Sequence, residues 1–256
     1  MARKKRLIIP VFIPFGGCPN RCVFCDQSGM TGRLTLPAPE EVRGIIEAYL
    51  STWRGAGPRE AAFYGGSFTA LPLEAQKKYL GCVSEYLAGG RIDGIRLSTR
   101  PDCISTEGVR FLSGYGVTTV ELGAQSMDAS VLKASGRGHG PEDTVRAVGI
   151  LKAAGMGVGL QFMPGLPGDT VQSVLRTARE VIKLSPDFVR VYPTVVVRNT
   201  GLEEMFKEAG IWIARMGLQN TEELERSVVA GPYHPSFRDL VQGHRNEALP
   251  RNQPRG

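Results

Sequence analysis

The sequence predicts an α/β protein whose main domain is a partial barrel of six strand-helix units. Three observations support this fold class. Short apolar runs alternate with amphipathic stretches, and each pair takes about 30 residues, the length of a right-handed parallel crossover. Motifs rich in Gly, Pro and Cys follow the expected strands. The chain has 256 residues, of which 42% are hydrophobic, enough to bury one substantial core.

Strands are expected where apolar runs are bounded by Gly or Pro, and helices where the apolar spacing is helical. The expected strands are Leu7–Phe15, Glu60–Tyr64, Gly94–Thr99, Val117–Leu122, Gly157–Met163 and Phe188–Tyr192. The expected helices are Pro39–Trp53, Leu73–Leu87, Thr106–Tyr115, Asp128–Ala134, Pro141–Ala154 and Asp169–Leu184.

Six such units fit either a partial barrel or an open doubly wound sheet. In a βα barrel the loops after the strands converge on one mouth. An open dinucleotide-binding sheet would place G-x-G-x-x-G after its first strand, and Gly16-Gly17-Cys18 does not match. The barrel is therefore preferred, with a site at its mouth. The loops expected there are Cys18–Cys25, Gly65-Gly66, Arg100–Asp102, Gly123–Ser126 and Pro164–Gly168.

Three of the five cysteines lie within eight residues, at Cys18, Cys22 and Cys25. Thiols this close together are typical of a metal site. A structural zinc ion takes four protein ligands, and no further Cys or His follows in the next fifty positions. Three thiolates and one vacancy suit a cubane [4Fe-4S] cluster, whose fourth iron can bind a small molecule. A zinc or iron loop, or three unrelated thiols, is the alternative.

The pattern C-x-x-x-C-x-aromatic-C, with Phe24 as the aromatic residue, resembles the signature of radical S-adenosylmethionine (SAM) enzymes. The resemblance implies a [4Fe-4S] cluster on Cys18, Cys22 and Cys25, with SAM at the open iron. It implies that an electron from the cluster cleaves SAM to methionine and a 5′-deoxyadenosyl radical, which abstracts hydrogen from a substrate. An electron donor such as flavodoxin or ferredoxin is implied as well.

Further motifs narrow the resemblance to the radical SAM core of the Elongator catalytic subunit and its shorter bacterial relatives. Oxygen-independent coproporphyrinogen oxidase is a more distant likeness. The resemblance covers residues 8 to 192 and implies a (βα)6 TIM-like partial barrel, open laterally to a large substrate. The motifs are Gly65-Gly66-Ser67-Phe68-Thr69, Thr99-Arg100-Pro101-Asp102, Glu121-Leu122-Gly123-Ala124-Gln125-Ser126, Ser135-Gly136-Arg137-Gly138-His139 and Met163-Pro164-Gly165-Leu166-Pro167-Gly168.

The same resemblance implies contacts to SAM. Arg137 is expected to pair with the methionine carboxylate, where its fork of donors suits a carboxylate. Gln161 is expected at the ribose hydroxyls, Ser98 is a second ribose candidate, and Gln125 lines the site. For Arg137 the alternative is a surface arginine at a glycine-rich turn.

Gly65 and Gly66 are similar to the start of a Gly-Gly-Glu-Pro motif that holds the methionine amino group in radical SAM proteins. Residues without side chains let the backbone approach a ligand closely. Ser67 stands where the motif has Glu, so the backbone is expected to carry more of this contact. An ordinary tight turn is the alternative.

Other residue types of interest receive no role in the reaction. His139 is interpreted as a turn or cap histidine, and Cys82 and Cys103 as inert thiols, although Cys103 lies near the mouth. Glu121 and Asp102 are candidate carboxylates at the mouth.

The net charge of +6 permits an anionic partner such as RNA. Most of the excess lies in Met1–Arg6 and in Gln242–Gly256, and the latter is interpreted as a disordered tail or an RNA-contacting arm. No apolar run reaches 18 residues, and the N-terminus lacks a signal-peptide pattern. A cytoplasmic location is expected, where reducing conditions preserve the thiols.

The expected domains are a radical SAM core over residues 1–200 and a short C-terminal extension over 201–256. The extension is expected to hold a helix, Leu202–Ala209, and a strand, Ile211–Met216. Similar proteins carry a longer insertion between Phe206 and Ile211, and no acetyltransferase-like domain is expected after the core. Three functions remain open: a radical SAM enzyme of unidentified substrate, one that modifies RNA, or a non-catalytic cluster- or metal-binding protein with a degenerate SAM site.

Overall fold

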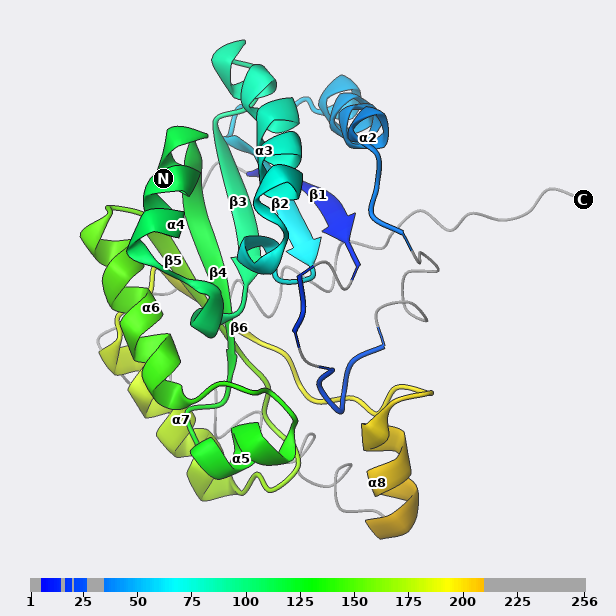
Figure 1. Cartoon of the computed structure of the whole chain (residues 1–256), viewed down its shortest axis with the longest axis vertical. Helices are drawn as coiled ribbons and strands as arrows, with labels where there is room; N and C mark the ends of the chain where they lie inside the picture. The colour runs from blue at the N-terminus through cyan, green and yellow to red at the C-terminus, as the bar shows by residue number, and fades with distance from the viewer. Residues whose placement is uncertain (1–5, 15–16, 20, 27–34, 210–256) are drawn as a thin grey trace, which may run out of the picture.

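Six parallel strands form one sheet whose spatial order follows the chain, from β1 to β6 (Figure 1). The computed structural model describes residues 6–14, 17–19, 21–26 and 35–209. The strands are β1 (Leu7–Ile13), β2 (Arg59–Gly65), β3 (Gly94–Thr99), β4 (Val117–Gln125), β5 (Gly157–Phe162) and β6 (Phe188–Val191).

A helix follows each of the first five strands, and a last helix follows β6. Single turns of 3₁₀ helix, η1 (Phe68–Ala70) and η2 (Pro101–Cys103), follow β2 and β3. The helices are α2 (Pro39–Thr52), α3 (Leu73–Ala88), α4 (Thr106–Gly114), α5 (Ala129–Ala134), α6 (Pro141–Ala153), α7 (Val171–Lys183) and α8 (Gly201–Ala209).

The sequential strand order confirms the predicted partial barrel. A doubly wound sheet reverses its strand order at a switch point, whereas every neighbour here is the next strand in the chain. Among the described residues, β1 and β6 each pair with one strand only. The sheet is therefore an open half-barrel, and the carboxyl ends of its strands share one end of the molecule (Figure 1).

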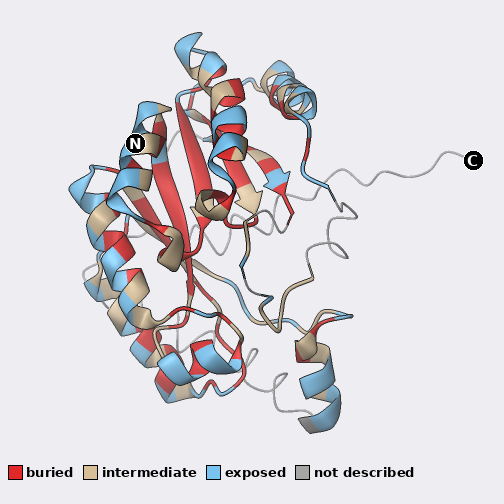
Figure 2. Ribbon diagram, in the orientation of Figure 1, coloured by how far each residue is buried: buried red, intermediate tan, exposed pale blue. Residues whose placement is uncertain are grey.

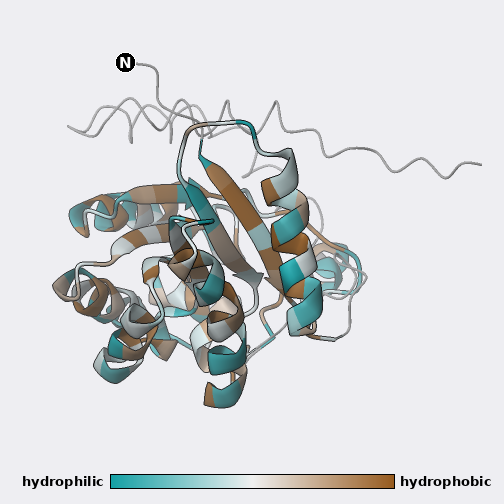
Figure 3. Cartoon of the chain, turned by 90° about the horizontal axis from the view of Figure 1, so that it is seen from above, coloured by the Kyte–Doolittle hydropathy of each residue, from teal (hydrophilic) through white to brown (hydrophobic). Residues whose placement is uncertain are grey.

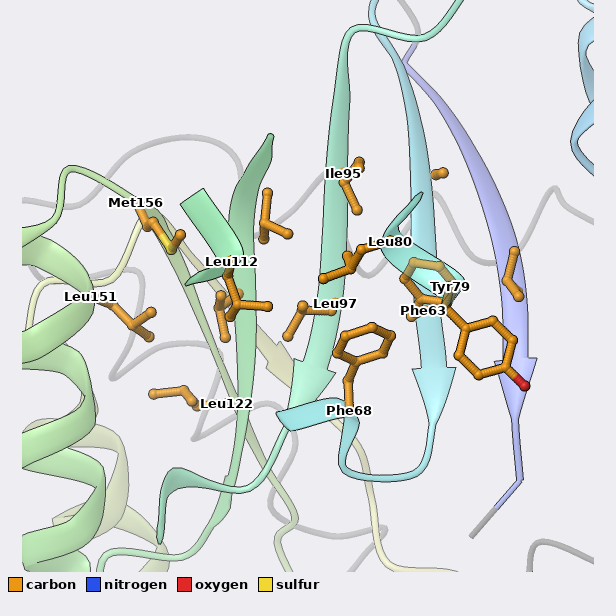
Figure 4. Packing of buried hydrophobic residues seen from close by; sticks show 14 of the residues in the cluster. Phe63, Phe68, Tyr79, Leu80, Ile95, Leu97, Leu112, Leu122, Leu151 and Met156 are labelled. Atoms are coloured by element: carbon orange, nitrogen blue, oxygen red, sulfur yellow. The ribbon is translucent and has the colours of Figure 1, made fainter. Parts of the chain in front are cut away.

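The outer face of the half-barrel packs against the helices. Leu97 of β3 and Leu122 of β4 are fully buried there, as are Leu80 of α3 and Leu112 of α4 (Figures 2 and 4). Because strand residues alternate between faces, the neighbours of these leucines in the strands point to the inner face. The helices carry both hydrophilic and hydrophobic residues, as expected for elements with one face on a core (Figure 3).

Polar caps fix where several helices begin. Ser105 accepts a hydrogen bond from Gly108 N at the start of α4, and Asp128 accepts one from Ser130 N at the start of α5. Thr170 caps α7 in the same way, so this helix begins at Val171 rather than at Asp169 as predicted.

The remaining differences from prediction are small. β1 ends at Ile13, and β4 continues to Gln125 beyond the predicted Leu122. The predicted strand Ile211–Met216 and the basic tail lie outside the described residues. Within the described residues, no helix is long and apolar enough to cross a membrane.

Candidate active site at the mouth of the half-barrel

The cysteine loop lies between β1 and α2, and two later segments hold it. Within the loop, Cys25 N donates to Cys22 O over 3.1 Å. Val23 N donates to Ser135 O, just after α5, and Leu202 N of α8 donates to Val23 O over 2.7 Å. The backbone of the loop is therefore held between the segment after α5, in the fourth strand-helix unit, and the last described helix. Figure 1 shows α8 beside this loop.

The structure brings every residue predicted to bind the cluster or SAM to one pocket. Its lining comes from the cysteine loop and from the ends of β2, β3, β4 and β5, together with the segment after α5. The predicted residues in the lining are Cys18, Cys22, Cys25, Gly65, Gly66, Ser67, Ser98, Gln125, Arg137 and Gln161. Residues that line the pocket and received no role from the sequence are Arg21, Phe24, Thr99, Arg100 and Gly123.

Gly17 allows the cysteine loop to approach the loop after β2. Its φ is +72°, and a Cβ there would lie 2.3 Å from Ser67 O and 2.6 Å from Leu71 N. Only glycine fits so close a backbone contact. As a result, Cys18 Sγ lies 3.7 Å from Ser67 Oγ. The Ser67 side chain, which is buried, thus faces the cysteine loop.

Arg137 crosses from the segment after α5 to the cysteine loop. Its Nη1 donates to Cys22 Sγ over 3.1 Å, its Nη2 donates to Gly123 O over 2.6 Å, and its Nε donates to His139 Nε2 over 3.3 Å. The side chain is buried, with 6% of the residue exposed. The surface alternative for Arg137 is therefore wrong.

His139 is a partner of Arg137 rather than a simple cap. Because Nε2 accepts from a guanidinium, the proton of the neutral ring lies on Nδ1, which is 3.3 Å from Gly140 O. Burial and the neighbouring Arg137 charge lower the pKa of His139 below its usual value. The ring is thus held in its neutral form.

Gln125 stands in a conformation that few non-glycine residues adopt. Its φ is +66°, and the β4–β5 register shifts between Gly123 and Gln125. Its side-chain Oε1 is buried and has no hydrogen-bond partner. A Cβ on Gly123 would lie 2.8 Å from Gln125 Nε2. Strained backbone and an unpartnered buried acceptor commonly mark a ligand site.

Glu121 lies on the inner face at the centre of a hydrogen-bond network that joins five strands. It is 0% exposed and accepts from Tyr64 Oη and Arg96 Nη1 at 2.9 Å, from Arg190 Nε at 2.8 Å and from Gln161 Nε2 at 3.1 Å. Burial opposes its ionisation, but Arg190 and Arg96 outweigh burial and hold its pKa below the usual range.

This network orients Gln161. Its amide nitrogen donates to the carboxylate of Glu121, so the amide oxygen is the group left for a ligand in the pocket. Ser98 Oγ is 3.4 Å from Phe63 O, a long hydrogen bond that leaves the hydroxyl partly committed to the backbone. Glu121 is therefore not a carboxylate exposed at the mouth of the barrel. It is buried and orients Gln161, which lines the pocket.

The two remaining cysteines, Cys82 and Cys103, do not line the pocket. Cys82 is buried in α3, where burial raises the pKa of its thiol. Cys103 is half-buried, and burial followed by the Asp102 charge raises its pKa also. Raised pKa values keep both thiols protonated and poorly reactive.

The donor set of the cysteine loop fits a cubane cluster. Cys18, Cys22 and Cys25 all line the pocket. A cubane offers each thiolate its own iron, so its ligands need not converge on one point. The pocket supplies room beside these thiols, and the unpartnered Gln125 oxygen supplies hydrogen-bonding capacity.

Comparison with known proteins agrees with this geometry. The profile of the Radical SAM superfamily matches residues 12–181, and the chain belongs to that superfamily. It is thus a radical SAM enzyme, whose cofactors are a [4Fe-4S] cluster and SAM.

One relative is named for tRNA modification, and another is named for the Elongator complex. The tRNA uridine(34) acetyltransferase of Methanocaldococcus infernus is 29% identical in an alignment 244 residues long that covers 78% of this chain and 45% of the relative. Elongator complex protein 3 of Saccharomyces cerevisiae is 29% identical, over 66% of this chain and 34% of the relative. The chain thus spans about half or less of these relatives.

Solved structures show the same fold. The Elp3 of M. infernus aligns with a TM-score of 0.63 at 26% identity, covering 80% of this chain and 50% of that one. Coproporphyrinogen III oxidase of Escherichia coli aligns with a TM-score of 0.60 at 18% identity, covering 94% of this chain and 53% of that one. Both predicted resemblances are confirmed.

Proposed function

We propose that this chain cleaves SAM reductively at a [4Fe-4S] cluster and uses the resulting radical to modify an RNA. The observation that carries the proposal is the single pocket in which all predicted cofactor residues meet. Its lining includes three thiols, the buried Arg137 and two amide side chains, which are groups suited to hold an iron-sulfur cluster and an amino-acid nucleoside together.

Cys18, Cys22 and Cys25 are proposed as the cluster ligands. When bound, the cluster supplies an electron that cleaves SAM to methionine and a 5′-deoxyadenosyl radical, and this radical takes hydrogen from the substrate. The protein positions the loop through the bonds of Val23 to Ser135 and Leu202. A half-barrel wall on one side limits access of water to the radical.

The remaining lining residues are proposed to hold SAM. Arg137 pairs with its carboxylate, because a buried guanidinium needs an anionic partner. Gln125 Oε1 and Gln161 Oε1 are acceptors suited to the ribose hydroxyls, since one has no partner in the protein and the other is oriented by Glu121. Ser98 is a further polar group on the same side.

Gly65 and Gly66 are proposed to hold the methionine amino group. Gly65 has a φ of +103°, which turns the backbone after β2 toward the pocket. Ser67 is buried against Cys18 and supplies no carboxylate. The amino group is therefore expected to bind backbone carbonyls, with the pocket-lining Ser67 Oγ as a side-chain acceptor on this loop.

RNA is proposed as the substrate because relatives are named for tRNA uridine(34). The net charge of +6 suits an anionic partner. Flavodoxin or ferredoxin is the proposed electron donor, and the cytoplasm the proposed location. The lateral opening between β1 and β6 gives a large substrate a route to the pocket.

The test is formation of 5′-deoxyadenosine by the anaerobically reconstituted protein with SAM and dithionite, with and without total tRNA. The wild type and Cys82→Ala are expected to form it, and tRNA is expected to increase the yield. Cys22→Ala is expected to lose both cluster and product, because two thiolates cannot hold a cubane with one open iron. Full cleavage by Cys22→Ala would reject the ligand assignment, and a cluster without cleavage would indicate a non-catalytic protein.

A further inference from the structure

Arg100 is a second buried arginine at the pocket, and the cofactor assignments above give it no role. It follows the last residue of β3, lines the pocket together with Cys22 and Arg137, and is 3% exposed. A buried guanidinium carries a large desolvation cost and needs a compensating anion. Asp102, two residues further along the same loop, supplies part of that compensation.

Asp102 fixes the orientation of the Arg100 guanidinium through two hydrogen bonds. Arg100 Nε donates to Asp102 Oδ1 and Arg100 Nη2 donates to Asp102 Oδ2, both over 2.9 Å. This bidentate pairing fixes the plane of the guanidinium. The turn η2 makes the pairing possible, because it brings residue 102 back beside residue 100. Asp102 is the more exposed partner, with 24% of its side chain accessible.

The charge of Arg100 extends to the cysteine loop. Burial opposes this charge, but the bond with Asp102 outweighs burial and raises the Arg100 pKa. The thiols of Cys103 and Cys22 act in the same direction as Asp102. Because Arg100 and Cys22 line the same pocket, this charge lies near a proposed cluster ligand as well as beside its carboxylate partner.

The cluster proposed for this pocket is an anion. Three thiolates on a [4Fe-4S] core leave one excess negative charge in the oxidised state, and reduction adds another. In a buried site the more negative state is stabilised by a fixed nearby cation, and net charge is among the factors that set cluster potentials. Within the described pocket lining, Arg100 and Arg137 are the buried cations.

We propose that the Arg100–Asp102 pair sets the reduction potential of the cluster, with Arg100 favouring the reduced state and Asp102 moderating it. This inference rests on the proposed function, because it requires the cluster. Arg137 is expected to be neutralised in part by the SAM carboxylate when SAM binds, whereas Arg100 is tied to its own loop. Arg100 is therefore the cation whose effect on the cluster persists with or without SAM.

The test is a redox titration of the reconstituted protein without SAM, followed by electron paramagnetic resonance of the reduced cluster. Arg100→Gln removes the cation and is expected to lower the midpoint potential. Asp102→Asn removes the carboxylate charge and is expected to raise it. Arg100→Lys keeps the charge and is expected to shift the potential less than Arg100→Gln. Arg91→Gln, which breaks an exposed ion pair with Glu47, is the control and is expected to have no effect.

Opposite signs for Arg100→Gln and Asp102→Asn distinguish an electrostatic role from a structural one. If the Arg100–Asp102 pair only holds the loop in its conformation, the two variants shift the midpoint potential in the same direction or not at all. Either result would overturn the proposal. If Arg100→Gln holds no iron, Asp102→Asn decides: a raised midpoint potential supports the proposal, and a lowered or unchanged one overturns it. If none of the three variants assembles a cluster that the wild type assembles, the pair is structural and the proposal fails. Failure of the wild type to assemble a cluster would instead count against the proposed function.

Discussion

Arg137 Nη1 donates a hydrogen bond to Cys22 Sγ over 3.1 Å, joining residues that lie 115 positions apart. The contact connects the segment after α5 to the cysteine loop. Because the guanidinium is also bonded to Gly123 and His139, its position is determined before any cofactor binds. The arginine proposed for SAM is thus already directed at the loop proposed for the cluster.

Arg137→Lys is expected to weaken SAM binding by at least about tenfold, because an ammonium cannot replace two parallel hydrogen bonds to a carboxylate. Equilibrium dialysis of SAM with the reconstituted protein measures this. Arg176→Lys, at an exposed pair with Asp128, is the control. Unchanged SAM affinity with an intact cluster would remove Arg137 from the SAM site.

Gln125→Gly is expected to lower the affinity for SAM without lowering the stability of the chain. Glycine adopts a φ of +66° without strain, so the free energy of unfolding of the apo chain is expected to hold or rise by about 1 kcal/mol. SAM affinity is expected to fall, because the unpartnered Oε1 is lost. Urea unfolding and SAM dialysis measure the two effects. Undiminished SAM affinity in Gln125→Gly would show that this oxygen binds no ligand.

Protonation of His139 is expected to destabilise the fold. Its pKa is lowered in the folded state, so the unfolded chain binds the proton first as pH falls below about 6.5. Stability is therefore expected to be full above this pH and to decline as pH falls toward the folded-state pKa. Urea unfolding at pH 7.5 and 5.5 measures the decline, which His139→Gln is expected to reduce. An equal decline in both proteins would assign the effect to other groups.

Glu121→Gln is expected to destabilise the chain by about 3 to 5 kcal/mol, the usual cost of breaking a buried ion pair from one side. Arg96 would then keep Glu60 as its partner, at 2.7 Å, but Arg190 would lose its carboxylate. Glu180→Gln, at an exposed pair with Lys183, is expected to change stability by less than about 0.5 kcal/mol. Comparable small losses in both variants would show that the network is dispensable.

The sequence predicted the order of the elements because Gly and Pro mark the end of nearly every strand and helix. The residues of the pocket were predicted from the resemblance to radical SAM enzymes, and the topology explains why they meet. In a parallel sheet, residues at the carboxyl ends of successive strands share one edge, so Gly65, Ser98, Gln125 and Gln161 converge there.

The side-chain hydrogen bonds of the folded chain could not be predicted from local sequence pattern. The role of Glu121 depends on donors from β2, β3, β5 and β6, and that of His139 on its pairing with Arg137. Asp169 was assigned to a helix because acidic residues favour helix starts, but its carboxylate accepts from Gly165 N of the preceding loop and from Ser173 Oγ of α7. In each case a specific side-chain hydrogen bond decides what composition leaves open.

The central claim is that the pocket holds a [4Fe-4S] cluster to which SAM binds directly. The most direct test is low-temperature electron paramagnetic resonance of the reconstituted, dithionite-reduced chain with and without SAM. A [4Fe-4S]⁺ signal whose g values change when SAM is added is the expected result. A cluster signal that SAM does not alter would contradict the account, because it would show that Arg137, Gln125 and Gln161 form no cofactor site beside the thiols.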